Sequence, residues 1–185
     1  MTRAIAPGLQ AALLLARGRT DAIMLVAESA QSDFAAARRS FWAMPLCVPA
    51  LICLYLADRP EMPSARGLAT DLIAFVIVWI GFALLSLRLA ERIGRGALWP
   101  RFIILWNWCT LVQHLVLVAG TLPAVLGAPD WIGQTASLAA VGWALWLEWF
   151  ATRLALGLPG LAAAGMVALD LALGLLVAGL TGATG

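Results

Sequence analysis

Residues 102–127 read FIILWNWCTLVQHLVLVAGTLPAVLG, an apolar run interrupted by side chains that form hydrogen bonds. The run exceeds the roughly 20 residues that a helix needs to cross a bilayer. Its polar members are Asn107, Cys109, Thr110, Gln113, His114 and Thr121. A helix that faced only lipid would not carry so many, because each unsatisfied hydrogen-bonding group costs free energy in hydrocarbon. The stretch therefore predicts a central helix around which other membrane-spanning helices pack.

The composition of the whole chain is typical of a membrane protein rather than of a soluble domain. Of its 185 residues, 63% are hydrophobic and 12% are charged, against about 25% charged in an ordinary globular protein. The mean hydropathy is +0.93. The formal net charge is only +2 and no basic cluster is present, which argues against a nucleic-acid partner. We expect one membrane domain that has the lipid bilayer as its first partner.

Turn signals divide the chain into five predicted membrane spans. These cover residues 39–57, 67–88, 102–127, 131–156 and 160–181, within a five-helix transmembrane domain at 37–183. Between them lie a turn with two prolines at 58–63, an Arg-rich loop at 88–101, and Gly-Pro turns at 127–130 and 157–160. The predicted fold class is an all-α membrane protein, a bundle of five transmembrane helices.

Residues 1–36 precede the bundle and are predicted to form a short amphipathic segment on the cytoplasmic side. Pro7 suits a first helical position, and Leu9, Leu13 and Ala16 share one helical face. The apolar run is too short to cross the hydrocarbon, so we expect it to lie in the headgroup plane. Packing against the base of the bundle is the alternative.

The arginines predict the orientation of the chain. The side predicted to be cytoplasmic holds ten of them: Arg3, Arg17, Arg19, Arg38, Arg39, Arg88, Arg92, Arg95, Arg101 and Arg153. The other side holds only Arg59 and Arg66. The positive-inside rule then places the N-terminus in the cytoplasm and, with five spans, the C-terminus in the periplasm of a bacterial inner membrane.

Three ionisable residues, His114, Glu148 and Asp170, fall inside predicted spans. Such residues are costly at membrane depth and are candidates for function. His114 lies 13 residues after Arg101, and Asp170 lies 12 residues after Leu158, so the two are expected at similar depth and are predicted to pair.

The candidate intramembrane polar site comprises His114, Asp170, Glu148, Asn107 and Thr110. It is open to two interpretations. The set can form a proton path or small-solute site of a transporter, or it can be a satisfied polar core that fixes which helices pack together. The second is favoured because one histidine and two acids are a sparse set.

Enzymatic chemistry finds little support in the sequence. There is no H-E-x-x-H, G-x-S-x-G or phosphate-binding glycine loop, so no catalytic residue, metal site or cofactor is predicted. The one enzymatic alternative is a lipid-modifying activity at the cytoplasmic face. Its candidate headgroup contacts are Arg88, Arg92, Arg95 and Arg101.

The layout of an amphipathic N-terminal segment followed by five spans resembles the Yip1-type family of small membrane proteins. The stretch from Asp33 through Arg39-Ser40-Phe41-Trp42 to Pro45 also resembles uncharacterised alphaproteobacterial membrane proteins. The resemblance implies an accessory or trafficking-like role and carries no site residue across. Together these observations predict an inner-membrane protein with a structural or accessory role, as a subunit of a larger assembly or a homo-oligomer.

Overall fold

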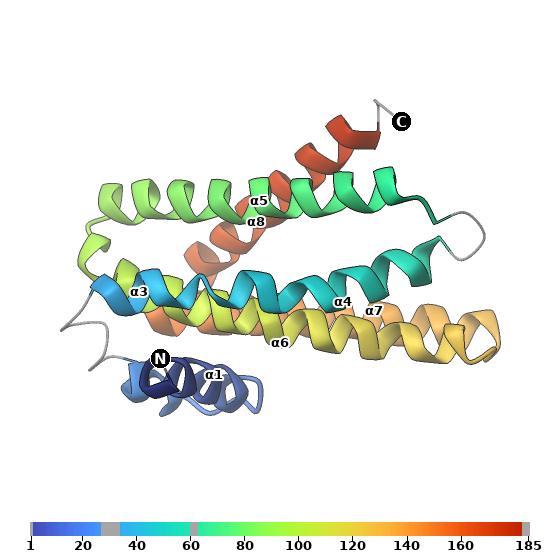
Figure 1. The fold of residues 1–185 in the computed structure, drawn as a ribbon. Coiled ribbons are helices and arrows are strands. Elements are labelled where there is room, and N and C mark those ends of the chain that lie inside the picture. The colour runs from blue at the N-terminus through green and yellow to red at the C-terminus, as the bar shows by residue number, and fades with distance from the viewer. Residues whose placement is uncertain (1, 27–33, 60–62, 183–185) are drawn as a thin grey trace.

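The structure is a computed structural model that describes residues 2–26, 34–59 and 63–182. The predicted N-terminal segment and the end of the predicted domain extend beyond these ranges, and Asp33 lies outside them. Within them the secondary structure is helical throughout. The helices are α1 (Thr2–Leu15), α3 (Phe34–Ser40), α4 (Ala43–Asp58), α5 (Ala65–Arg92), α6 (Trp99–Val125), α7 (Asp130–Leu156) and α8 (Gly160–Gly182), with the 3-10 turn η1 (Gly96–Leu98) before α6. The long helices α4 to α7 run alongside one another and α8 crosses them at an angle (Figure 1).

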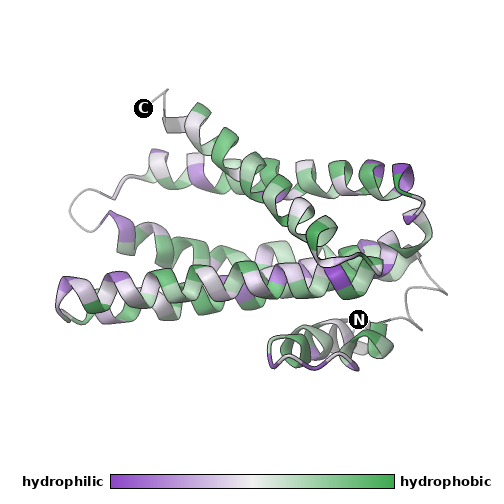
Figure 2. Ribbon diagram, turned by 180° about the vertical axis from the view of Figure 1, so that it is seen from behind, coloured by the Kyte–Doolittle hydropathy of each residue, from purple (hydrophilic) through white to green (hydrophobic). Residues whose placement is uncertain are grey.

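Four helical segments of the described chain are long and apolar enough to cross a membrane. They are Ala35–Asp58, Ala65–Arg92, Gly96–Val125 and Gly160–Thr181. The prediction of an all-helical membrane protein therefore agrees with the structure for four of the five spans. The fifth, at 131–156, corresponds to α7, which is long enough but less apolar because it carries Gln134, Glu148 and Arg153. Apolar residues cover the lengths of α4, α5 and α8 in Figure 2.

The first predicted span is built from two helices. α3 ends at Ser40 and α4 begins at Ala43, with a turn at Phe41 and Trp42 between them. Pro45 lacks the amide hydrogen that would otherwise bond the carbonyl of Phe41, so a continuous helix loses a hydrogen bond at this point. The break lets α3 and α4 pack against different parts of α6.

α6 is the central helix, as residues 102–127 predict. It packs against α7, α4, α1 and α3, and every residue from Phe102 to Gln113 is buried. α7 returns antiparallel along it after a tight turn at Gly127, which has φ +78°. Small residues bring the two helices together: a Cβ added to Gly120 would lie 2.7 Å from the Cβ of Ala140. Such close backbone approach is the usual way in which membrane helices associate.

α5 and α8 form the outer part of the bundle. α8 packs against α5 and α7, and α5 makes fewer contacts with α6 than α7 does. Only 22% of the most apolar stretch of each helix is buried, against 67% for α6. The exposed residues on them are large and apolar, as at Ile73, Leu84, Leu175 and Leu180. These faces suit contact with lipid or with another membrane protein.

α1 packs on the bundle, beside the half of α6 that follows the Arg-rich loop (Figure 1). Ala11, Ala12 and Leu15 are fully buried. Gly8 lies so close to Trp108 that a Cβ at this glycine would be 2.4 Å from the indole ring. These contacts match the packing alternative for the N-terminal segment, whereas its place in the headgroup plane stays a prediction.

The contact between Gly8 and Trp108 predicts opposite effects for two glycine substitutions. Gly142 is also inside a helix, but nothing lies within 4 Å of a Cβ added there. Gly142→Ala should therefore raise the free energy of unfolding by up to about 1 kcal/mol, the ordinary gain for replacing glycine in a helix. Gly8→Ala should lower it by about 1–3 kcal/mol, because overpacking displaces α1. Unfolding in detergent followed by tryptophan fluorescence measures both, and equal gains would contradict the packing of α1.

Candidate functional site

The polar residues of α6 take their partners partly from neighbouring helices. Asn107 donates from Nδ2 to Ser40 Oγ on α3 at 2.6 Å, and Ser40 in turn donates to the carbonyl of Ala37. Gln113 donates from Nε2 to the carbonyl of Ala144 on α7 at 2.7 Å. These two bonds confirm that other helices supply partners to the polar interior of α6. They also tie α3 and α7 to the same helix.

Thr110 and His114 are satisfied within α6 itself. Thr110 donates from Oγ1 to the carbonyl of Trp106 at 2.8 Å, and the Nδ1 of His114 lies 2.7 Å from the carbonyl of Thr110. The imidazole ring also stands edge to face against Phe75 of α5, with ring centroids 5.5 Å apart. His114 is therefore held by a backbone carbonyl and an aromatic ring.

The two acidic residues inside the bundle meet each other. Glu148 of α7 and Asp170 of α8 interact through their carboxyl groups, and the indole of Trp106 on α6 interacts with both. Glu148 is only 7% exposed and its Oε1 has no hydrogen-bond partner, while Asp170 is half-buried. The ion pairs of Arg19, Arg59 and Arg88 lie near the ends of helices, away from the two acids. The neighbours of the two carboxyl groups among the described residues are each other, the indole of Trp106 and the thiol of Cys109, and none of these is a cation.

Aromatic rings pack around Trp106, the neighbour of this pair of acids. Trp106 packs against Trp79 of α5 with ring centroids 5.3 Å apart, and against Phe82 of the same helix at 4.9 Å. Trp79 is 2% exposed, and its indole Nε1 has no hydrogen-bond partner in the described chain. Trp106 therefore belongs to an aromatic cluster formed by α5 and α6, and the acids lie beside it.

The structure does not bring the predicted pair of His114 and Asp170 together. Neither a hydrogen bond nor an ion pair joins these two side chains, and Asp170 faces Glu148 and Trp106 instead. Equal depth along two helices does not determine on which side of a third helix each residue lies. Because α8 packs on α7 and α5, its acid faces α7, while His114 faces α5. The candidate site is thus divided: Glu148 and Asp170 form one part, and His114, Thr110 and Asn107 belong to the packing of α6.

The register of the last helical hairpin is the signal that would have found the acid pair. Glu148 lies nine residues before Gly157, and Asp170 lies ten residues after Gly160. Counted from the turn that joins α7 to α8, the two acids are level to within about 2 Å at 1.5 Å rise per residue. Adjacent antiparallel helices bring such residues together.

Of the arginines proposed as headgroup contacts, Arg101 has a structural role. It donates from Nε to the carbonyl of Ala155 at 2.9 Å and bonds the same carbonyl through Nη2. The guanidinium thereby satisfies a free carbonyl at the C-terminal end of α7. Arg88 bonds Glu91 at 3.3 Å, and the exposed Arg92 and Arg95 extend from the same end of the bundle.

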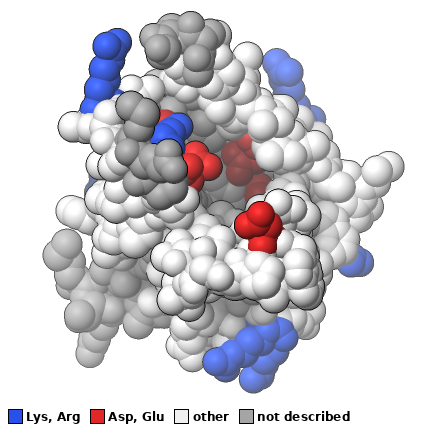
Figure 3. Space-filling view, turned by 90° about the vertical axis from the view of Figure 1, so that its right-hand side faces the viewer, with Lys and Arg blue, Asp and Glu red and all other residues white. Residues whose placement is uncertain are grey.

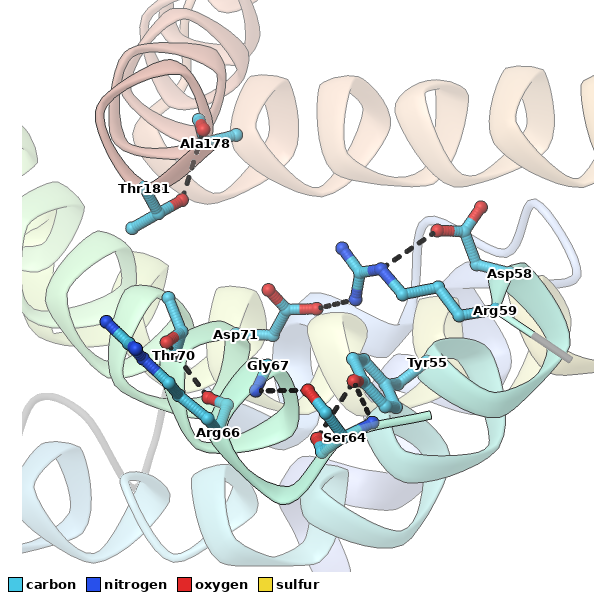
Figure 4. A network of polar contacts seen from close by, with 10 residues as sticks. All are labelled: Tyr55, Asp58, Arg59, Ser64, Arg66, Gly67, Thr70, Asp71, Ala178 and Thr181. Atoms are coloured by element: carbon cyan, nitrogen blue, oxygen red, sulfur yellow. Dashed lines mark hydrogen bonds and ion pairs between the residues drawn. The ribbon is translucent and has the colours of Figure 1, made fainter. Parts of the chain in front are cut away.

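The opposite end carries a polar cluster that the sequence analysis did not anticipate (Figure 4). Arg59 bonds Asp71 of α5 at 2.7 Å and lies 4.7 Å over the ring of Tyr55. The Tyr55 hydroxyl donates to the carbonyl of Ser64 at 2.9 Å, and Ser64 caps α5 by accepting from Gly67. The hydrogen bond to Asp71 raises the pKa of Arg59. The cluster closes the connection between α4 and α5.

This end of the molecule is hollowed. Figure 3 looks onto it and shows acidic side chains both at the rim of the hollow and inside it. A pocket between α4 and α5 is lined by the Arg59–Asp71 pair, Tyr55 and leucines of both helices. In the described chain, no group of three or more His, Cys, Asp or Glu side chains is placed to hold a metal ion.

Comparisons of the chain with protein-family models, with curated proteins and with solved structures found no match. The resemblance to the Yip1-type family therefore stays a prediction. What the geometry establishes is an all-helical protein with four helices able to span a membrane and a pair of buried acids on two of its adjacent helices.

Double-mutant cycles should distinguish residues that are in contact, such as Ser40 and Asn107, from His114 and Asp170, which are not. Ser40→Ala with Asn107→Leu should show a coupling of about 0.6 kcal/mol, the average for polar contacts between membrane helices. His114→Leu with Asp170→Leu should instead be additive within about 0.5 kcal/mol, as expected of residues without a shared partner. Unfolding in detergent gives both couplings. A clear coupling between His114 and Asp170 would overturn the separation of the two groups.

Proposed function

We propose that the protein is a five-span integral protein of a bacterial inner membrane with a structural or accessory role. It would act as a subunit of a larger membrane assembly or as a homo-oligomer. The observation that carries this proposal is the packed stretch of α6 at the centre of the bundle. Phe102 to Gln113 form an unbroken buried stretch, packed by the aromatic rings of α5 and α6.

The position of α7 supports a fifth span. It is 27 residues long and packs along α6, which has the same length. A helix of this length extends about 40 Å, enough to cross a bilayer with its interfaces. Its glutamate is buried and its arginine, Arg153, lies in its last turn, where a cation favours the helix dipole. The polar residues that lower its hydropathy thus face the protein or the end of the helix.

The distribution of arginines supports the proposed orientation. Arg88, Arg92, Arg95 and Arg153 belong to the end of the bundle where α5 meets α6 and α7 meets α8. Arg59 and Arg66 belong to the opposite end. The bias toward one end favours a cytoplasmic location for that end and for α1.

The alternative of a transporter receives less support from the geometry. A transport path needs access from both faces, whereas Phe102, Trp106 and Trp108 are all buried in the half of α6 nearest the Arg-rich loop. The hollow visible in Figure 3 lies at the other end. The alternative of a lipid-modifying site at the Arg-rich end also receives less support, because Arg101 is already bonded to α7.

Reporter fusions test the number of spans and their orientation together. A reporter active only in the periplasm should be inactive at Gly94, active at Ala128 and inactive again at Leu158. The last two positions are the turns at either end of α7, so they lie on opposite sides only if α7 crosses the membrane. Activity at both Ala128 and Leu158 would contradict the proposed five spans. Activity at Gly94 would show that the orientation is the opposite of the one proposed.

Photo-crosslinking in the native membrane tests the accessory role. A photoreactive residue is introduced singly at Ile77 on α5, Leu138 on α7 and Leu175 on α8, which are 53%, 73% and 65% exposed. A subunit should give protein adducts of defined mass from one of these faces and lipid adducts from the others, resolved by mass spectrometry. Lipid adducts alone from all three positions would contradict membership of an assembly.

A further inference from the structure

The buried acids Glu148 and Asp170 are not explained by a structural role alone. A packed membrane interior normally pairs a carboxylate with a cation or surrounds it with donors. Here the four carboxyl oxygens are all acceptors when ionised, and Trp106 supplies one indole N–H between them. The Oε1 of Glu148 remains buried without a donor. At least one further hydrogen-bond donor is therefore needed beside the two carboxyl groups.

The other ionisable side chains of α5 to α8 do not supply this donor. On α6, Cys109 lies beside Glu148, His114 is bonded to the carbonyl of Thr110, and Arg101 is bonded to the carbonyl of Ala155. On α7, Arg153 is exposed and stacks on Trp149. The charged residues of α5 lie toward the ends of that helix: Arg66, Asp71, Arg88, Glu91 and Arg92. Asp170 is the only charged residue of α8 between Gly160 and Gly182.

We propose that Glu148 and Asp170 form a proton-binding site, in which the two carboxyl groups hold one proton between them. Two carboxylates side by side in a low-dielectric interior repel each other, and a single shared proton removes that repulsion. The protonated carboxyl also becomes an O–H donor and satisfies an acceptor that otherwise has none. The ligand is a proton taken from water, so no further reactant is required.

The two acids have different roles in this site. Glu148 is nearly fully buried beside Trp106, whereas Asp170 is half-buried and is the more accessible of the two. The proton therefore enters and leaves through Asp170 and is retained by Glu148. Because α8 packs mainly on α5 and α7 among the long helices, the shared proton is also a bond that joins α8 to the bundle.

Infrared spectroscopy of the purified protein in lipid nanodiscs tests the site. At neutral pH the wild type should show the C=O stretching band of a protonated carboxyl, which disappears as the pH rises. In the isosteric variants Glu148→Gln and Asp170→Asn the band should disappear at a lower pH than in the wild type, because the new amide carries no charge to repel the remaining carboxylate and can donate a hydrogen bond to it. Asp130→Asn, at an exposed acid on α7, should leave the pH dependence of the wild type unchanged. Absence of the band in the wild type, or an unchanged pH dependence in both interior variants, would overturn the proposal.

A labelling experiment on the unmodified chain keeps the test valid if an interior variant fails to fold. A hydrophobic carbodiimide reacts with protonated carboxyls in apolar surroundings, and mass spectrometry locates the product. Glu148 or Asp170 should be labelled at neutral pH, less so at alkaline pH, and Asp130 should stay unlabelled. No labelling of either interior acid would contradict the site. Labelling that appears only when sodium and potassium are replaced by choline would show that a metal cation, rather than a proton, occupies it.

Discussion

The polar side chains of α6 take hydrogen-bond partners inside the protein, although the Oδ1 of Asn107 is buried without one in the described chain, and this constraint organises the bundle. Where the helix surface is buried against neighbours, Asn107 and Gln113 bond Ser40 on α3 and the backbone of α7. Where a partner from another helix is lacking, Thr110 and His114 bond the carbonyls of their own helix. The polar residues therefore determine the neighbours of α6, and the small residues along α7 allow that helix to approach most closely.

The same constraint explains why the two acids stand apart from the rest of the interior. A buried amide can be satisfied by a hydroxyl or a carbonyl, but a buried carboxylate needs a donor or a cation. α5 offers aromatic rings at this depth and α8 offers a second acid. A proton is the smallest group that resolves this arrangement, and it does so without any change in packing. The proton stabilises the packing of α8, which together with α5 is the least buried of the long helices.

The two ends of the bundle are closed by different interactions. At the Arg-rich end, Arg101 satisfies the end of α7, and Trp99 donates to Ser86 across the loop between α5 and α6. At the other end, Arg59, Asp71, Tyr55 and Ser64 close the connection between α4 and α5 (Figure 4). The second end is hollowed, as Figure 3 shows, and the first carries a pocket lined by Ala35, Ala37, Arg38, Phe41 and Trp99.

The amino-acid sequence is sufficient to identify the membrane class, the helical fold, the central position of residues 102–127 and the approximate limits of the helices. These follow from hydropathy, from turn residues and from the cost of burying polar groups, all of which act locally along the chain. The partners of the ionisable residues depend on how each helix is rotated and on which helices are adjacent, and no local property encodes that. His114 and Asp170 lie at matched depth, yet the packing of α8 on α7 brings Asp170 to Glu148 and leaves His114 against Phe75. The pairing of Arg59 with Asp71 likewise required the fold, because 12 residues and a turn separate the two in the chain.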